Sequence, residues 1–259
     1  MFAVGGYVPS NFRAWFRVSG PRAALFLSLW LTASGTASAG PDGADGAHTE
    51  IFTGLDATDN STQGYVGGGY AFGKGMDERG LRFRVLGAFG GYNYESGPGG
   101  APITNFDGQD VFGAVLLGYQ IGGGGSVLKL FAGIEAENQA VTPHDPNNAV
   151  QGQALGLKLQ AEGWLDLSER SFLSVDAAYG SAFQEYWGLA RLGYRLAPAY
   201  SVGVEAGALG NEEYGAQRGG AFLRFNLMAT EITVSGGFSG NYLDDDPSGY
   251  VSVGIYRRF

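Results

Sequence analysis

The sequence predicts an all-β fold: a transmembrane antiparallel up-and-down β-barrel of about 12 strands, preceded by a cleaved signal peptide. Three observations predict it. The chain begins with a basic and apolar leader, and the remainder alternates apolar and polar residues over short segments. The last segment, GYVSVGIYRRF, keeps one apolar face as far as Phe259. Soluble domains usually end in a polar, poorly ordered tail, so this ending indicates contact with a membrane.

Residues 1–39 form the predicted signal peptide. Three arginines precede an apolar run that closes on Ala37-Ser38-Ala39, the A-x-A form of a cleavage site. The apolar run is shorter than the roughly 20 residues that a transmembrane helix needs, so we expect cleavage after Ala39. Residues 40–48 then form a short periplasmic segment, and residues 49–259 form the outer-membrane barrel.

Composition narrows the classes of function. Residues 1–39 contain three of the 16 basic residues and none of the 25 acidic ones, which leaves 13 basic against 25 acidic and a net charge of −12. Such a chain is not expected to bind nucleic acid. With no cysteine, it has neither disulfides nor thiolate metal sites. The 46 glycines and 14% aromatic residues favour curved, closely packed strands.

The strands are predicted from segments whose two faces differ in polarity, separated by links rich in Gly, Asp, Asn, Pro and Ser. The segments lie at 49–58, 64–73, 81–94, 109–121, 126–138, 150–165, 171–180, 186–197, 200–210, 219–228, 231–240 and 249–259. The links GKGMDER, GGGG, LSER, PA and AT are interpreted as the short set and alternate with longer polar stretches. Short turns on the periplasmic rim and long loops on the other are typical of outer-membrane barrels, and an even strand count places both termini in the periplasm.

The polar face of these strands carries both signs of charge. Leu155, Leu157 and Leu159, for example, alternate with Gly156, Lys158 and Gln160. A water-soluble barrel shows the same alternation, with the apolar face inward and the polar face toward water. The basic and apolar leader, the apolar C-terminus and the unequal loop lengths favour a membrane barrel instead. The charged residues assigned to the lumen are Asp56, Arg82, Arg84, Lys129, Glu135, Lys158, Glu162, Asp176, Arg191, Arg195, Glu205 and Arg224. Since isolated buried ions are costly, we expect a salt-bridged, wet lumen.

Aromatic residues fall into two groups. Seven tyrosines near strand ends are predicted to form an interfacial girdle: Tyr65, Tyr70, Tyr92, Tyr94, Tyr119, Tyr179 and Tyr242. Trp164 and Trp187 instead share the polar faces of their strands. These indoles could stack on sugar rings or pack across the lumen, and the pattern favours packing.

Motifs for catalysis or metal binding are weak. GGYAFGKG has phosphate-loop spacing, but glycine replaces the magnesium-binding Ser or Thr and no helix pattern follows. The two histidines, His48 and His144, are expected at opposite ends of the barrel. The sequence therefore predicts no catalytic residue, no metal site and no cofactor.

Several segments resemble the cellulose biosynthesis protein BcsS family of alphaproteobacteria. They include EIFTGLDATDNS, LKLFAGIEAENQAVTPHDPNNAVQGQALGLKLQAEGWLDLSERSFLSVDAAYG and SVGVEAGALGNEEYGAQRGGAFLRF, and the similarity runs from about Glu50 to Phe259. The resemblance implies an outer-membrane protein linked to cellulose production, and it supplies no catalytic residue.

The predicted function is a non-enzymatic outer-membrane barrel that assists β-glucan export or anchors the secretion machinery. The lumen residues assigned to glucan contact are Trp164, Trp187, Arg82, Arg84, Lys158, Glu162, Asp176, Arg191, Arg195, Glu205 and Arg224. The expected partners are outer-membrane lipid, cellulose, components of its secretion machinery, and the barrel assembly machinery, for which Phe259 resembles the terminal aromatic signal. The alternatives are a lipid-modifying barrel enzyme, which requires His144 beside a Ser and an acid, and a passive structural or adhesive barrel.

Overall fold

The computed structural model describes residues 46–96, 104–240 and 248–259. The predicted signal peptide, its Ala37 and Ala39, and most of the 40–48 segment lie outside the described residues. The strands are β1 (Thr49–Thr58), β2 (Ser61–Ala71), β3 (Gly80–Ser96), β4 (Thr104–Gly123), β5 (Ser126–Thr142), β6 (Gly152–Asp166), β7 (Ser171–Gly180), β8 (Glu185–Ala197), β9 (Tyr200–Gly210), β10 (Gly215–Leu227), β11 (Thr230–Gly240) and β12 (Ser248–Arg258).

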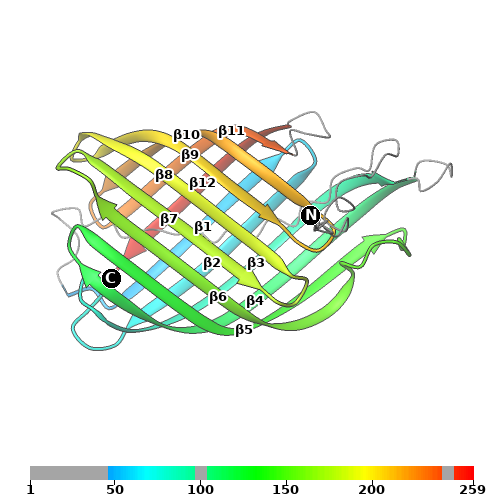
Figure 1. Ribbon diagram of the computed structural model, residues 1–259, viewed down its shortest axis with the longest axis horizontal. Helices are drawn as coiled ribbons and strands as arrows, with labels where there is room; N and C mark the ends of the chain where they lie inside the picture. The colour runs from blue at the N-terminus through cyan, green and yellow to red at the C-terminus, as the bar shows by residue number, and fades with distance from the viewer. Residues whose placement is uncertain (1–45, 97–103, 241–247) are drawn as a thin grey trace, which may run out of the picture.

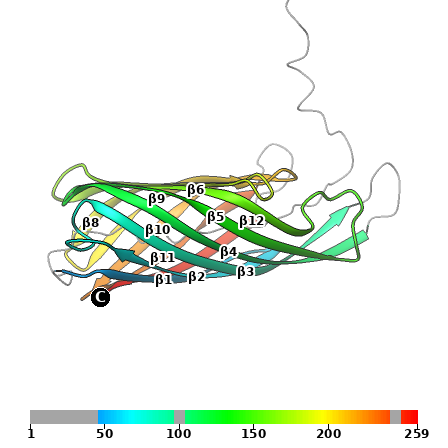
Figure 2. The ribbon, with the colours of Figure 1, turned by 90° about the horizontal axis from the view of Figure 1, so that it is seen from below.

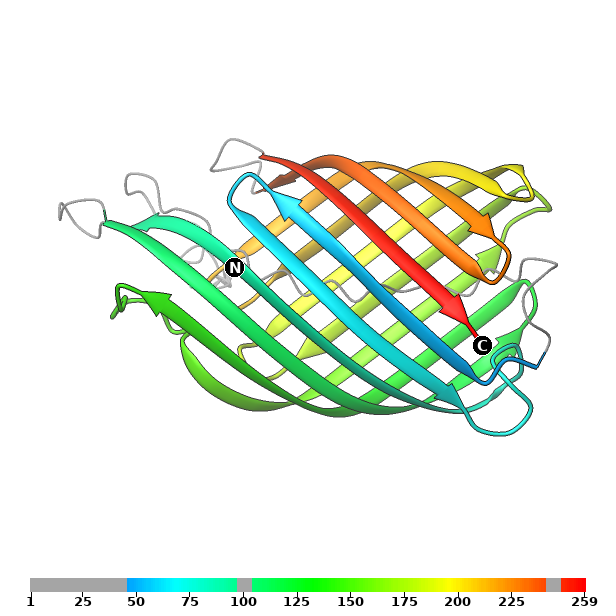
Figure 3. The ribbon, with the colours of Figure 1, turned by 180° about the vertical axis from the view of Figure 1, so that it is seen from behind.

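These strands form one closed antiparallel barrel in which each strand pairs with its neighbours in the chain (Figure 1). The seam lies between β1 and β12, which are side by side in Figure 3, with Glu50 opposite Arg258 and Phe52 opposite Tyr256. Closure leaves no free sheet edge, as hydrocarbon requires of any structure that spans it. The predicted 12-stranded up-and-down barrel is confirmed.

Four consecutive strands are longer than the rest. β3, β4, β5 and β6 span 17, 20, 17 and 15 residues, whereas the other strands span 10 to 13. The sequence pattern ends β3 and β5 too early and begins β4 too late, because residues 95–96, 104–108 and 139–142 show no clear alternation of apolar and polar residues. In Figures 1 and 2 the far ends of this wall extend past the other strands.

We call the end of the barrel that holds Thr49 and Arg258 the terminal end, and the opposite end the loop end. His48 and Thr49 both donate backbone hydrogen bonds to the carbonyl of Phe259, so the start of β1 and the C-terminus lie together. Three links at the terminal end, 124–125, 198–199 and 228–229, contain two residues each. The predicted asymmetry of the links is not uniform, since 72–79 is long at the terminal end and 59–60 is short at the loop end.

The outer surface is apolar, and the alternation along β12 shows how the sequence produces this. Val251, Val253 and Ile255 are exposed, whereas Tyr250 and Tyr256 on the other face are buried. An outward apolar band with a polar interior is the pattern of an outer-membrane barrel. Among the described residues, no helix is long and apolar enough to cross a membrane.

Glycines on the inner wall make room for aromatic rings from the neighbouring strand. A Cβ on Gly193 would lie 2.1 Å from Cζ of Phe172, and one on Gly67 would lie 2.3 Å from Cζ of Phe52. Rings that lie flat over cross-strand glycines fill space close to the wall. This packing accounts for the joint abundance of glycine and aromatic residues.

The predicted girdle of seven tyrosines is only partly correct. Tyr70, Tyr119 and Tyr179 are exposed on the outer face, whereas Tyr65, Tyr92 and Tyr94 point inward and are buried. Tyr242 lies outside the described residues.

Candidate functional site

The lumen is the candidate site because the inward faces of the strands bring most charged residues of the barrel together there. The buried charged residues of the strands are Glu50, Asp56, Arg82, Arg84, Asp110, Lys129, Glu135, Glu137, Lys158, Glu162, Asp176, Glu185, Arg191, Glu205, Arg218, Arg224, Glu231 and Arg258. A charge removed from water costs several kcal/mol unless it is paired, so the contacts among these side chains determine whether the lumen is open or filled.

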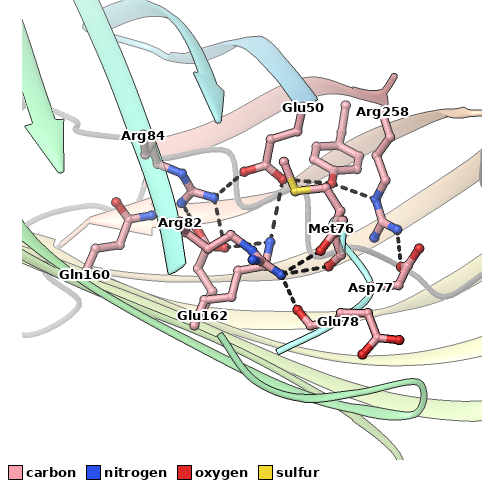
Figure 4. A network of polar contacts seen from close by, with 12 residues as sticks. Glu50, Met76, Asp77, Glu78, Arg82, Arg84, Gln160, Glu162 and Arg258 are labelled. Atoms are coloured by element: carbon pink, nitrogen blue, oxygen red, sulfur yellow. Dashed lines mark hydrogen bonds and ion pairs between the residues drawn. The ribbon is translucent and has the colours of Figure 1, made fainter. Parts of the chain in front are cut away.

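A four-membered ion network crosses the lumen near the terminal end (Figure 4). Arg84 lies between two carboxylates: its Nη2 is 2.7 Å from Oε1 of Glu50, and its Nη1 pairs with Oε1 of Glu162. Lys129 Nζ lies 3.6 Å from Glu50 and 3.5 Å from Glu162. The hydroxyl of Tyr256 donates to Glu50 at 2.9 Å. Two cations and two carboxylates thus neutralise each other between β1, β3, β5 and β6.

The link between β2 and β3, residues 72–79, folds inward at the terminal end, and Figure 4 shows Met76, Asp77 and Glu78 of this link beside the network. Arg82 Nη2 donates to the carbonyls of Gly75, Met76 and Glu78, at 3.2 and 3.3 Å for the first two. Arg258 Nη1 pairs with Asp77 at 2.7 Å. The backbone N–H of Met76 donates to the carbonyl of Ala47, and the Met76 side chain is only 3% exposed. We call residues 72–79 the terminal plug.

Further polar contacts line the inner wall between β8 and β1. Arg218 binds Asp56 through two hydrogen bonds of 3.1 Å, a contact between β10 and β1. Glu205 accepts from Arg191 at 2.7 Å and from the hydroxyl of Tyr250 at 2.6 Å. Bidentate and charge-assisted contacts of this kind are the strong class of polar interaction, so they hold these side chains in fixed positions on the inner wall.

Aromatic rings occupy the lumen between these charges. Trp164 stacks on Phe172 with ring centroids 4.3 Å apart, and Arg224 lies 5.4 Å from the Trp164 ring and 5.3 Å from the Phe172 ring. Trp187 packs in an apolar cluster with Leu189 and Leu209. Each indole is 4% exposed, so neither presents a free face to a sugar in this conformation.

At the loop end, residues 143–151 between β5 and β6 fold over the opening. Asp145 is 3% exposed and accepts from the Tyr94 hydroxyl at 2.9 Å. The N–H of Ala149 donates to Glu213 Oε1 at 2.9 Å, which joins this loop to the link between β9 and β10. We call residues 143–151 the loop lid. His144, on the lid, hydrogen-bonds the Gln151 amide rather than the Ser and acid that a lipid-modifying enzyme would need.

The loop half of the lumen carries an excess of negative charge. Asp110, Glu135, Glu137 and Glu185 are buried there, and Glu135 pairs with Lys158, whose Nζ is 3.1 Å away. Within the residues that the structure describes, no group of three or more His, Cys, Asp or Glu residues is arranged to hold a metal ion.

The structure places the sequence-predicted site residues as follows. Trp164, Trp187, Arg82, Arg84, Lys158, Glu162, Asp176, Arg191, Glu205 and Arg224 are buried on the inner wall, while Arg195 is partly exposed and pairs with Asp166 at 2.5 Å. Arg84 and Glu162 contact each other, as do Arg191 and Glu205. Arg82 holds the terminal plug instead of facing the lumen centre. Phe259 ends the chain directly after β12 and is 51% exposed.

Several lumen residues escape the sequence reasoning. Glu50 lies an even number of residues before Asp56 on β1, so the alternation alone places both side chains on the same inward face. Arg218 lies at the start of β10, where the sequence GAQRGG shows no alternation of apolar and polar residues. The alternation becomes clear about four residues later. Arg258 has the parity opposite to Phe259 and therefore points inward, whereas Arg257 is exposed on the outer face beside the Phe259 ring, at 5.0 Å from its centroid.

Comparisons with known proteins agree with this architecture. A family model described as "Cellulose biosynthesis protein BcsS" matches residues 51–259. The chain is similar in structure to a TodX mutant, a monoaromatic hydrocarbon channel, with TM-score 0.54, 7% identity, and coverage of 91% of this chain and 95% of that one. It is also similar to the transport unit of the autotransporter AIDA-I from Escherichia coli, with TM-score 0.50, 10% identity, and coverage of 90% and 94%. These two likenesses concern the fold. No curated protein sequence matches the chain.

Proposed function

The chain belongs to the cellulose biosynthesis protein BcsS family, and from this membership we propose that it is a non-enzymatic outer-membrane scaffold that anchors the cellulose secretion machinery. In this proposal both termini face the periplasm, and the glucan does not pass through the barrel. The observation that supports anchoring over conduction is the filled lumen. The terminal plug, the ion networks and the loop lid occupy successive levels of it.

Passage of a glucan chain would require these levels to open together. Removing one partner of a buried ion pair typically costs about 3–5 kcal/mol. Buried pairs at Arg84 and Arg218 join strands that are not neighbours in the barrel. A neutral sugar offers no charge to replace the lost partners. The rims, by contrast, are available to partners without any rearrangement of the barrel.

A covalent lock distinguishes anchoring from conduction. The chain contains no cysteine, so Ala149→Cys with Glu213→Cys places unique thiols on the loop lid and on the link that it contacts. Cells that lack the gene would be complemented with this pair, treated with a thiol cross-linker, and assayed for cellulose at the surface. Each single-cysteine variant is the matched control.

We expect the locked barrel to support as much cellulose export as the unlocked one. Export that falls only when both cysteines are present and cross-linked would overturn anchoring and show that glucan uses the lumen. Normal export in the strain that lacks the gene would overturn any role in cellulose secretion.

A further inference from the structure

The wall of long strands has one side without a partner strand beyond the level at which the barrel closes. β6 pairs with β5 from Gly152 to Leu165, but it pairs with β7 only from Lys158 onward. Residues 152–157 therefore have a strand on one side only, where β5 and β6 extend past the turn between β7 and β8 (Figure 1). We call residues 152–157 the β6 edge.

The hydrogen bonds of Leu157 show which backbone groups point to the open side. Its N–H donates to Ser181 Oγ at 2.8 Å, and its carbonyl accepts from the N–H of Ser181 at 2.9 Å. Because the backbone groups of an antiparallel strand alternate between its two neighbours, the N–H and C=O groups of Gln153 and Leu155 face the same side. After Ser181 the chain turns inward, and the N–H of Ala182 donates to a carboxylate on the inner wall. Within residues 46–96, 104–240 and 248–259, no hydrogen bond joins these four edge groups to a partner.

The β6 edge lacks the features that usually protect a sheet edge from pairing. Charged side chains, proline and bulges have this role in other proteins. The edge sequence GQALGL contains no charged residue and no proline, and it pairs with β5 without a shift of register. On the other side of the wall, Asn93 of β3 is capped by Asn60, which accepts from its N–H at 3.0 Å and donates to its carbonyl at 3.4 Å.

The backbone and the side chain of Leu155 need different things from whatever covers them. Open sheet edges do not occur in hydrocarbon, so the β6 edge lies at the level of headgroups or water. The Leu155 side chain is nevertheless 85% exposed, the largest value for a large apolar residue on the described strands. A lipid chain offers no hydrogen bond to the backbone, and water does not bury the leucine. A β-strand supplies both contacts.

We propose that the β6 edge binds an extended, uncharged segment of another polypeptide, which adds to the sheet as a further strand and places an apolar side chain beside Leu155. Main-chain hydrogen bonds to Gln153 and Leu155 would hold this strand, as in other cases of strand addition. A second copy of the chain does not fit, because two β6 edges pair antiparallel only when the barrels point in opposite directions. Copies inserted in one membrane point the same way. The site is at the loop end and is independent of the proposed anchoring function.

Two substitutions at position 155 separate the backbone from the side chain. Leu155→Pro removes an N–H that faces the open side and takes no part in the pairing with β5, a position where a strand tolerates proline. Leu155→Ala shortens the side chain and keeps the N–H, so it is the matched control. Residues 40–259 would be refolded into phosphatidylcholine nanodiscs, and the binding of a fluorescent peptide, TVTLTV, would be measured by anisotropy. The same peptide with alternate amides methylated has one edge that cannot donate.

We expect the peptide to bind wild type and to bind Leu155→Pro about tenfold more weakly, equivalent to about 1.4 kcal/mol, because one backbone hydrogen bond is lost. Leu155→Ala should weaken binding by less than about fivefold, as expected for one cross-strand side-chain contact. The peptide methylated on the edge that meets β6 should not bind wild type, a result that does not depend on how well the proline variant folds.

Three results would overturn the site. The first is a wild-type barrel that does not bind the peptide. The second is equal binding of the methylated and unmethylated peptides, which would mean that apolar contact alone holds them. The third is a dimer of wild-type barrels in the nanodiscs that Leu155→Pro abolishes and Leu155→Ala does not, because a second copy would then be the occupant.

Discussion

Replacing Arg84 with Met removes the centre of the terminal-end ion network while keeping much of its side-chain volume. Breaking a buried pair costs about 3–5 kcal/mol, chiefly because a carboxylate is left without its counter-ion. Lys129 stays 3.6 and 3.5 Å from the two carboxylates that Arg84 contacts, so it compensates in part. We therefore expect Arg84→Met to lower the free energy of unfolding by about 3 kcal/mol, the lower end of that range.

A second substitution tests whether an unpaired carboxylate causes the loss of stability in Arg84→Met. Arg84→Met with Glu162→Gln leaves one carboxylate, Glu50, facing Lys129, so the network is again neutral. This double variant should be more stable than Arg84→Met alone by about 1–2 kcal/mol, a coupling typical of contacting residues. Arg257→Met, on the exposed outer face beside the chain end, is the control and should change stability by about 0–1 kcal/mol.

Equilibrium unfolding by urea from lipid vesicles measures these differences, provided that the slope of free energy against urea concentration stays constant among the variants. A loss below about 1 kcal/mol for Arg84→Met would contradict the reasoning. So would a double variant whose loss is the sum of the two single losses. Either result would mean that water, and not Arg84, compensates the two carboxylates.

Four further predictions follow from other parts of the barrel. Gly193→Ala should cost about 1–3 kcal/mol in the same unfolding assay, because its Cβ would lie 2.1 Å from the Phe172 ring, whereas Gly219→Ala should cost nothing. Leu159→Arg on the outer face should cost about 2–4 kcal/mol, against about 0–1 for Leu196→Arg next to the terminal-end turn; equal costs would contradict the membrane position. Arg82→Ala with Tyr94→Phe and Glu213→Ala releases the terminal plug and the loop lid but leaves the ion networks between them, so in planar bilayers this variant should still show no current steps; steady conductance would contradict the filled lumen. Phe259→Ala should reduce the amount of folded barrel in cells while refolding in detergent stays normal; equal amounts in cells would remove its role as an assembly signal.

Much of the barrel is predictable from the sequence because a two-residue period reports directly which face meets lipid. The segments 171–180 and 200–210 match β7 and β9 to the residue. Strand ends are less predictable where polar residues occupy both faces, as at the start of β10, and Arg218 was therefore missed. Its partner Asp56 lies 162 residues earlier in the chain, and only the closed register brings the two together.

The plug and the lid show a second limit of sequence reasoning. The GKGMDER stretch has the composition of an ordinary turn, and nothing in it indicates that Arg82 and Arg258 hold it across the opening. Tyr92 and Tyr94 illustrate the same point, since tyrosines near strand ends usually face the interface, and here they pack inward under the lid. Contacts between distant segments decide whether a barrel of this size is open.

The conductance of single wild-type barrels in planar bilayers tests the central claim most directly. Residues 40–259 would be refolded, their folded state established by spectroscopy, and current recorded with and without added cello-oligosaccharide. The filled lumen predicts a folded barrel with no current steps and no response to the sugar. Steady conductance that the sugar blocks would contradict the account and identify the lumen as a path for glucan.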